Sequence, residues 1–183
     1  MRPLSLLPAL LCVALAGCGA SDDGGGSKPD KETFAEEGFE ITFDYPAEMQ
    51  LRDDVSLKQS AGSQADETVA LAFDEDDAIV VQRFDLNVEV TEDNVDDAKA
   101  ELDGVIAQLD PDAGSGKDIS LDGFEAFEYD IKPKAPPGAR SRYVVLFEGD
   151  AEYVINCQAT EERREDIADA CATALETVRP AKG

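Results

Sequence analysis

Apolar and polar residues alternate strictly from Gly38 to Tyr45, and Pro46 closes the segment. A period of two is typical of a β-strand with one buried and one solvated face. The buried face would carry Phe39, Ile41, Phe43 and Tyr45. Because a half-buried strand is stable only when it pairs with others over a core, this segment requires the chain to build a sheet.

Further short apolar or alternating segments, separated by turn residues, predict more strands at residues 68–73, 78–88, 119–121, 124–131, 140–148 and 152–158. A weaker strand signal lies around residues 55–58. Short turns join most of these segments, which favours an antiparallel sheet over repeated βαβ units.

Two segments instead have apolar residues at helical spacing. The first stripe comprises Val95, Ala98, Leu102, Val105, Ile106 and Leu109, with Thr91 as the expected N-cap. The second helix is expected over about residues 161–178. The sequence therefore predicts one α+β domain over residues 37–180, an antiparallel β-sheet flanked by two main helices.

Residues 1–17 have the layout of a signal peptide: a basic start, a short apolar run and small residues before Cys18. The pair Ala16-Gly17 before a cysteine resembles the bacterial lipobox, which implies a diacylglyceryl group on the Cys18 sulfur and cleavage before it. Residues 18–36 are rich in Gly, Ser and Asp and are expected to form a flexible tether. The alternative is an ordinary signal peptide that happens to contain cysteines.

Four cysteines are present; Cys12 would leave with the leader and Cys18 would carry lipid. Cys157 and Cys171 remain, on the predicted buried faces of a strand and of the following helix. In an exported protein such a pair is most simply a disulfide, worth about 3 kcal/mol in the chain-entropy model. Free thiols are the alternative.

The net charge of −25 argues against nucleic acid as a partner, because the phosphate backbone would be repelled. The chain has no histidine, which removes the commonest general base and metal ligand. The acidic clusters at 74–77 and 93–97 could hold a divalent ion loosely, but solvated turns are the simpler interpretation. No pair of carboxylates stands out for acid–base catalysis, so we expect no catalytic residues, no cofactor and no metal site.

One stretch is basic in this acidic chain. Segment 132–142 contains no acid and carries Lys132, Lys134, Arg140 and Arg142. It is the candidate contact loop for an acidic partner or a lipid headgroup. The alternative is a long hairpin connection that its prolines stiffen.

The strand openings also resemble those of PsbP-like domains. The resemblance rests on Phe39-Glu-Ile-Thr-Phe-Asp-Tyr-Pro46, the run from Gly123 to Tyr129, Arg142-Tyr-Val-Val-Leu-Phe147 and Glu152-Tyr-Val-Ile-Asn-Cys157, in order over about residues 38–179. It implies an α/β sandwich in a family whose members mostly bind proteins. The acidic composition and the lipobox look most like the actinobacterial lipoproteins of that family.

Together these features predict a lipoprotein anchored in the cell membrane through Cys18, on its extracytoplasmic side. The expected function is non-catalytic binding or scaffolding with an envelope protein partner. The alternative is a carrier or sensor of a small apolar or lipid ligand held between sheet and helix.

Overall fold

The computed structural model describes residues 30–52 and 65–181. Two helices are present among them, α1 (Val95–Leu109) and α2 (Arg164–Thr177). The strands are β1 (Lys31–Phe34), β2 (Ile41–Pro46), β3 (Gln50–Arg52), β4 (Glu67–Ala72), β5 (Ala78–Asp85), β6 (Lys117–Leu121), β7 (Phe124–Ile131), β8 (Arg140–Glu148), β9 (Ala151–Ala159) and β10 (Arg179–Pro180).

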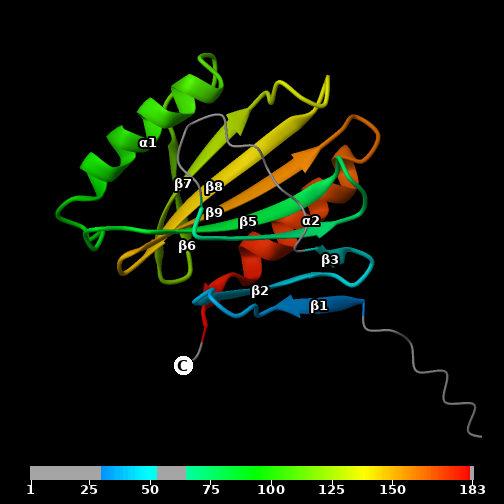
Figure 1. The fold of residues 1–183 in the computed structure, drawn as a ribbon, viewed down its shortest axis with the longest axis horizontal. Coiled ribbons are helices and arrows are strands. Elements are labelled where there is room, and N and C mark those ends of the chain that lie inside the picture. The colour runs from blue at the N-terminus through cyan, green and yellow to red at the C-terminus, as the bar shows by residue number, and fades with distance from the viewer. Residues whose placement is uncertain (1–29, 53–64, 182–183) are drawn as a thin grey trace, which may run out of the picture.

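The strands form two sheets (Figure 1). The large sheet has seven strands in the order β3-β4-β5-β9-β8-β7-β6, and every neighbouring pair in it is antiparallel. The small sheet has the order β1-β2-β10 and is also antiparallel. The prediction of an antiparallel α+β domain is confirmed.

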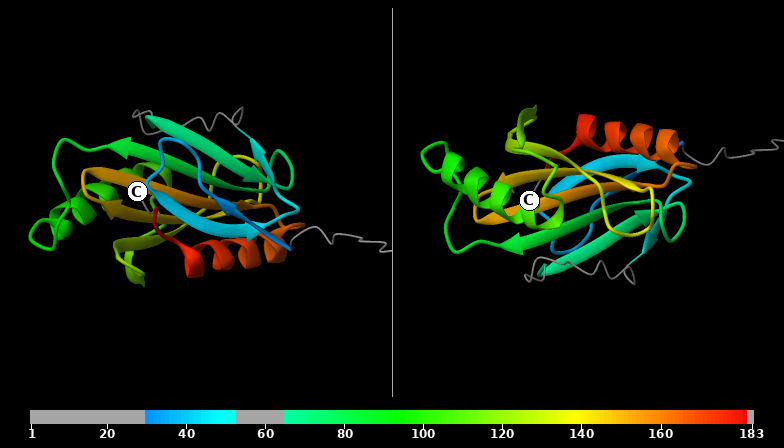
Figure 2. Two further views of the ribbon diagram at one scale, coloured as in Figure 1. Left: turned by 90° about the horizontal axis from the view of Figure 1, so that it is seen from below. Right: turned by 90° about the horizontal axis from the view of Figure 1, so that it is seen from above.

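Alternate residues of the central strands divide between two hydrophobic cores on opposite faces of the large sheet. On β9, Tyr153 and Ile155 join the main core, which also contains side chains of β2 and α2, such as Phe43 and Ala174. Val154, between them, joins the second core under α1. The small sheet and α2 therefore cover one face, and α1 lies on the other, where it packs mainly against β7 (Figures 1 and 2).

A disulfide between Cys157 of β9 and Cys171 of α2 crosses the main core. The two side chains are 4% and 1% exposed. The predicted disulfide is therefore confirmed, and it fixes α2 to the central strand of the large sheet.

Helix α1 spans the residues that the apolar stripe predicts, but the expected N-cap is wrong. Asn94, not Thr91, is the residue that precedes the first helical turn, and it makes no side-chain capping bond. Its Oδ1 accepts a hydrogen bond from the Thr91 backbone N–H instead, over 2.7 Å. The residues before the helix thus form a separate turn, closed by the side chain of Asn94.

Three strands were not predicted from the sequence: β1, β3 and β10. Strand β1 corrects the expected tether, since the ordered domain already includes Lys31–Phe34, and Phe34 is 1% exposed in the main core. The predicted signal peptide, Cys18, the tether up to residue 29 and the weak strand signal at 55–58 lie outside the described residues. Among the described residues no helix has the length and apolar character needed to cross a membrane.

Candidate functional site

A cleft of about 1160 Å³ lies between α1 and the large sheet. Strands β5, β8 and β9 form its floor and α1 forms one wall. The loop between β7 and β8 and the segment between β5 and α1 complete it. The name α1 cleft is used below for this site.

The α1 cleft exists because α1 covers only part of its face of the sheet. The helix contacts β7, near one edge of the sheet, and in the described part of the chain no helix covers the floor over β8, β9 and β5. Leu102 and Ile106 of α1 are buried toward the sheet, whereas Val105, from the same predicted stripe, is 39% exposed at the cleft. The other residues of the stripe lie in or against the second core, so Val105 is the residue of the stripe that is left exposed at the cleft.

Apolar side chains form most of the walls. The floor contains Val145, Phe147 and Val154, and the mouth contains Val88, which is 68% exposed. Apolar surface left in a concave site of this size is typical of ligand-binding pockets.

Asn156 is the most deeply buried polar residue of the floor. It lies on the central strand β9, beside Val80 of β5 and Tyr143 of β8, and its side chain is 1% exposed. Its Oδ1 has no hydrogen-bond partner among the described residues. Buried polar groups in native proteins are normally paired, so this acceptor calls for an explanation.

Glu152 lies four residues earlier on the same face of β9. Its side chain is half-buried, and this burial raises the pKa of the carboxyl group to about 7. Loss of hydration disfavours the charged form, so the floor of the cleft holds an acid that is largely neutral below this pH.

The charged groups around the cleft are mostly acidic. Lys134 is the basic residue of the lining, against the carboxylates of Asp76, Asp85, Asp97, Glu101 and Glu152. The cleft therefore presents a negative rim around a mainly apolar interior.

Asp103 anchors α1 to the sheet and so fixes the width of the cleft. It accepts hydrogen bonds from the Tyr129 hydroxyl (2.9 Å), the Gly116 backbone N–H (2.9 Å) and the Ser115 hydroxyl (2.5 Å). Burial acts to raise the pKa of this carboxyl group, but the three donors together outweigh it and lower the pKa.

Asp110, the C-cap residue, holds the C-terminal end of α1. Its carboxylate accepts the backbone N–H groups of Lys132 (2.8 Å) and Asp112 (3.0 Å). These two bonds lower the pKa of Asp110 and tie the helix C-terminus to the β7–β8 loop.

The four basic residues of the candidate contact loop do not form one patch. Lys134 lines the α1 cleft, whereas Arg140 and Arg142 lie on β8 and line a smaller pocket of about 440 Å³ near the disulfide, together with Arg164. Lys132 is exposed.

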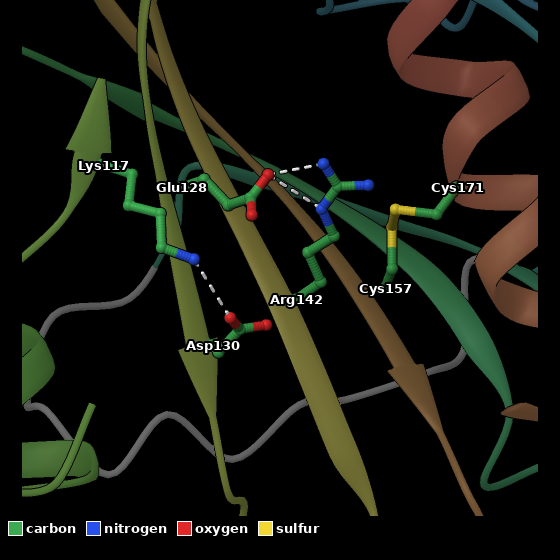
Figure 3. A network of polar contacts seen from close by, with 6 residues as sticks. All are labelled: Lys117, Glu128, Asp130, Arg142, Cys157 and Cys171. Atoms are coloured by element: carbon green, nitrogen blue, oxygen red, sulfur yellow. Dashed lines mark hydrogen bonds and ion pairs between the residues drawn. A yellow bond between two sulfur atoms is a disulfide. The ribbon is translucent and has the colours of Figure 1, made fainter. Parts of the chain in front are cut away.

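Arg142 is also already paired: its guanidinium forms an ion pair and a hydrogen bond with Glu128 of β7 (Figure 3). Two residues further along β7, Asp130 forms a separate ion pair with Lys117 of β6 over 3.5 Å (Figure 3). The role of the loop as a contact site stays a prediction.

The acidic cluster at 74–77 stabilises a turn. Asp74 accepts the backbone N–H groups of Asp76 and Asp77, each over 3.0 Å. Asp77 in turn accepts the backbone N–H (2.6 Å) and the hydroxyl (3.0 Å) of Thr160. In the described part of the chain, no three His, Cys, Asp or Glu side chains are arranged to hold a metal ion.

Sequence reasoning did not single out Asn156 or Glu152. Both are polar residues that interrupt the apolar run of β9, and this interruption was the available signal in the sequence. A polar residue within a strand does not by itself reveal whether it faces solvent, a partner or a cleft, because this depends on which helix covers that face.

No family model matches the sequence, and no curated protein matches it either. Solved structures do resemble it. Cyanobacterial PsbP (CyanoP) of Synechocystis has a TM-score of 0.56 at 12% identity, covering 86% of this chain and 96% of its own. A protein of Bacteroides thetaiotaomicron has a TM-score of 0.52 at 8% identity, covering 84% of this chain and 49% of its own.

LpqN of Mycobacterium tuberculosis, described as involved in cell envelope biogenesis, has a TM-score of 0.46 at 14% identity, covering 83% of this chain and 92% of its own. The likeness to CyanoP spans nearly the whole of both domains. The chain therefore has the PsbP-like fold that its strand openings suggested.

Proposed function

We propose that this PsbP-like domain is a non-catalytic binding protein that holds a small apolar or amphiphilic ligand in the α1 cleft. The observation that carries the proposal is the cleft itself, about 1160 Å³ of mainly apolar space between α1 and the sheet. A domain that served only as a rigid scaffold would gain stability by covering this surface, since apolar surface left in contact with water is unfavourable. A bound ligand would cover that surface.

The site of action in this proposal is the outer side of the cell membrane, with a lipid on Cys18 as the anchor. Two observations support it. The leader and the following cysteine have the lipobox pattern, and Cys157 and Cys171 form a disulfide, a bond typical of proteins exported to oxidising compartments.

Native mass spectrometry on protein purified gently from its own membranes tests the binding function. We expect excess mass that is lost on denaturation. Ala98→Phe should abolish the excess mass, because Ala98 of α1 lines the cleft and a phenyl ring there would project into the ligand space. Ala100→Phe places the same ring on an exposed position of the same helix and should leave the excess mass unchanged.

Excess mass that persists in Ala98→Phe would place the ligand elsewhere and contradict the proposal. Absence of excess mass in wild-type protein would favour a second candidate function, the docking of an envelope protein on this face. The exposed apolar rim residues Val88 (68%) and Val105 (39%) favour that candidate. In that case cross-linking through Lys134, at the edge of the cleft, should capture the partner.

A further inference from the structure

The unpaired acceptor in the α1 cleft bears on which ligands the cleft takes. Asn156 Oδ1 is buried at the floor and has no hydrogen-bond partner among the described residues. Leaving a buried acceptor unpaired costs free energy that a suitable donor would recover. A ligand that brings an O–H or N–H group to this point would therefore be favoured over one that does not.

The surroundings of Asn156 separate the polar from the apolar part of the cleft. Tyr143 lies directly opposite Asn156 on β8, and Gln158 is the next residue of β9 on the same face. On the α1 side the wall is apolar, with Leu102, Val105 and Ile106. A ligand that satisfies both regions has a polar end over β9 and a hydrocarbon part along α1.

The charge of the lining argues against an anionic polar end. Among the described residues, five carboxylates and one lysine line the cleft, and one of the carboxylates, Glu152, is half-buried in the floor. An anionic polar end brought into this partly desolvated space would be repelled by the carboxylates of the lining, with little screening by salt. The polar end should therefore be uncharged.

From these observations we infer that the α1 cleft selects an uncharged amphiphile whose polar end donates a hydrogen bond to Asn156 Oδ1. The inference rests on the proposed binding function and adds the chemical class of the ligand. The hydrocarbon part contacts the apolar side of α1, and the donor pairs with Oδ1 of Asn156, for which the described residues supply no donor.

Three probes of equal chain length separate these requirements: monolauroylglycerol, which is uncharged and carries hydroxyl donors; methyl laurate, which is uncharged and has no donor; and laurate, which is anionic. Binding is measured by calorimetric titration on the exported protein carrying Cys18→Ala, so that no protein-bound lipid competes. We expect monolauroylglycerol to bind about tenfold more tightly than methyl laurate, the equivalent of one net hydrogen bond. Laurate should bind more weakly than monolauroylglycerol at neutral pH.

Asn156→Leu tests the acceptor directly, since leucine has a similar size and no polar atom. The variant should lose the preference for monolauroylglycerol, about tenfold in affinity, and should bind methyl laurate at least as well as wild type. Its melting temperature should not fall, because the substitution removes a buried unpaired group; a variant that fails to fold leaves the probe comparison on wild-type protein as the deciding measurement.

The inference is overturned if wild-type protein binds the three probes equally, if laurate binds best, or if folded Asn156→Leu keeps the preference for monolauroylglycerol. That last result would mean that ordered water, not the ligand, donates the hydrogen bond to Asn156 Oδ1. A different result would contradict the proposed binding function itself: Ala98→Phe would leave the binding of all three probes unchanged. Equal binding of all probes that Ala98→Phe abolishes would keep the cleft as a binding site and remove only the selectivity.

Discussion

The Tyr129 hydroxyl on β7 donates a hydrogen bond to Oδ1 of Asp103 on α1, over 2.9 Å. Tyr129 is 2% exposed, and this contact also raises the pKa of its phenol beyond the effect of burial. Because α1 packs mainly against β7, the bond joins the wall of the cleft to its support. The width of the cleft thus depends on a polar contact at the side of the helix away from the ligand space.

Tyr129→Phe should lower the free energy of unfolding by about 1.5 kcal/mol, the contribution of a hydrogen bond to a charged acceptor. Urea unfolding measures it, and a double-mutant cycle with Asp103→Asn should give a coupling energy of about 1 kcal/mol. Tyr143→Phe is the control: Tyr143 lies opposite Tyr129 on β8, and burial alone raises the pKa of its phenol, with no hydrogen bond contributing. Additive effects of the two substitutions would show that the bond is not formed in solution.

Gly116 is held against the same tyrosine. A Cβ at this position would lie 2.5 Å from Cζ of Tyr129, a clash that requires the ring or the backbone to move. Gly116→Ala should therefore destabilise the protein by about 1–3 kcal/mol. Gly104→Ala makes the same change within α1, where no atom lies within 4 Å of the added methyl, and should stabilise by up to about 1 kcal/mol. Thermal unfolding distinguishes the two, and equal effects would contradict this local geometry.

Removal of the disulfide should destabilise the domain substantially. The bond closes a loop with a sequence separation of 14, so the double substitution Cys157→Ala and Cys171→Ala should cost about 3 kcal/mol. Denaturant unfolding measures the change, and Cys12→Ala, in the predicted leader, should have no effect on the purified protein. Alkylation of both cysteines in unreduced native protein would contradict the disulfide.

Cys18 carries the prediction of membrane attachment. Cys18→Ala should move the protein from the membrane fraction to the soluble fraction, because the acyl chains that anchor it are lost. Cys12→Ala is the matched control and should leave the protein in the membrane fraction. A Cys18→Ala protein that still sediments with membranes and resists a salt wash would refute lipid attachment at this residue.

The sequence predicted those elements whose pattern is local. The alternation that begins at Phe39 and the stripe that ends at Leu109 are each complete within one segment, so periodicity alone identifies them. Strand β1 has a single buried residue, Phe34, and β10 has two residues in all. Both strands form by pairing with β2, which lies between them. This pairing leaves no pattern in the local sequence of β1 or β10.

The cleft was less predictable because it depends on where α1 lies. The apolar stripe of α1 predicts a buried helix face, and for Leu102 this is what the structure has. Val105 faces the cleft instead, since Asp103 holds the helix beside β7 through a residue 26 positions away in sequence. For the same reason, the sequence predicted that Cys157 is buried under α2 but not that Oδ1 of Asn156, on the opposite face, has no hydrogen-bond partner among the described residues.

Glu152 makes the stability of the domain depend on pH in a direction opposite to that of a paired carboxylate. Burial raises its pKa from 4.5 to about 7 in the folded protein. Between these values the folded state binds a proton that the unfolded state has released, so the contribution of Glu152 to stability falls as pH rises and is lost above about pH 7.

Glu152→Gln removes this titration and keeps the size of the side chain. At pH 5 the variant and the wild type should have similar stability, whereas at pH 8 the variant should be more stable by up to about 3 kcal/mol. Urea unfolding at both pH values measures the difference, and Glu101→Gln, at an exposed position of the same cleft, controls for the change in net charge. If the advantage of Glu152→Gln were the same at pH 5 and pH 8, the carboxyl group would not be desolvated, and the floor of the cleft would be more open to water than its burial indicates.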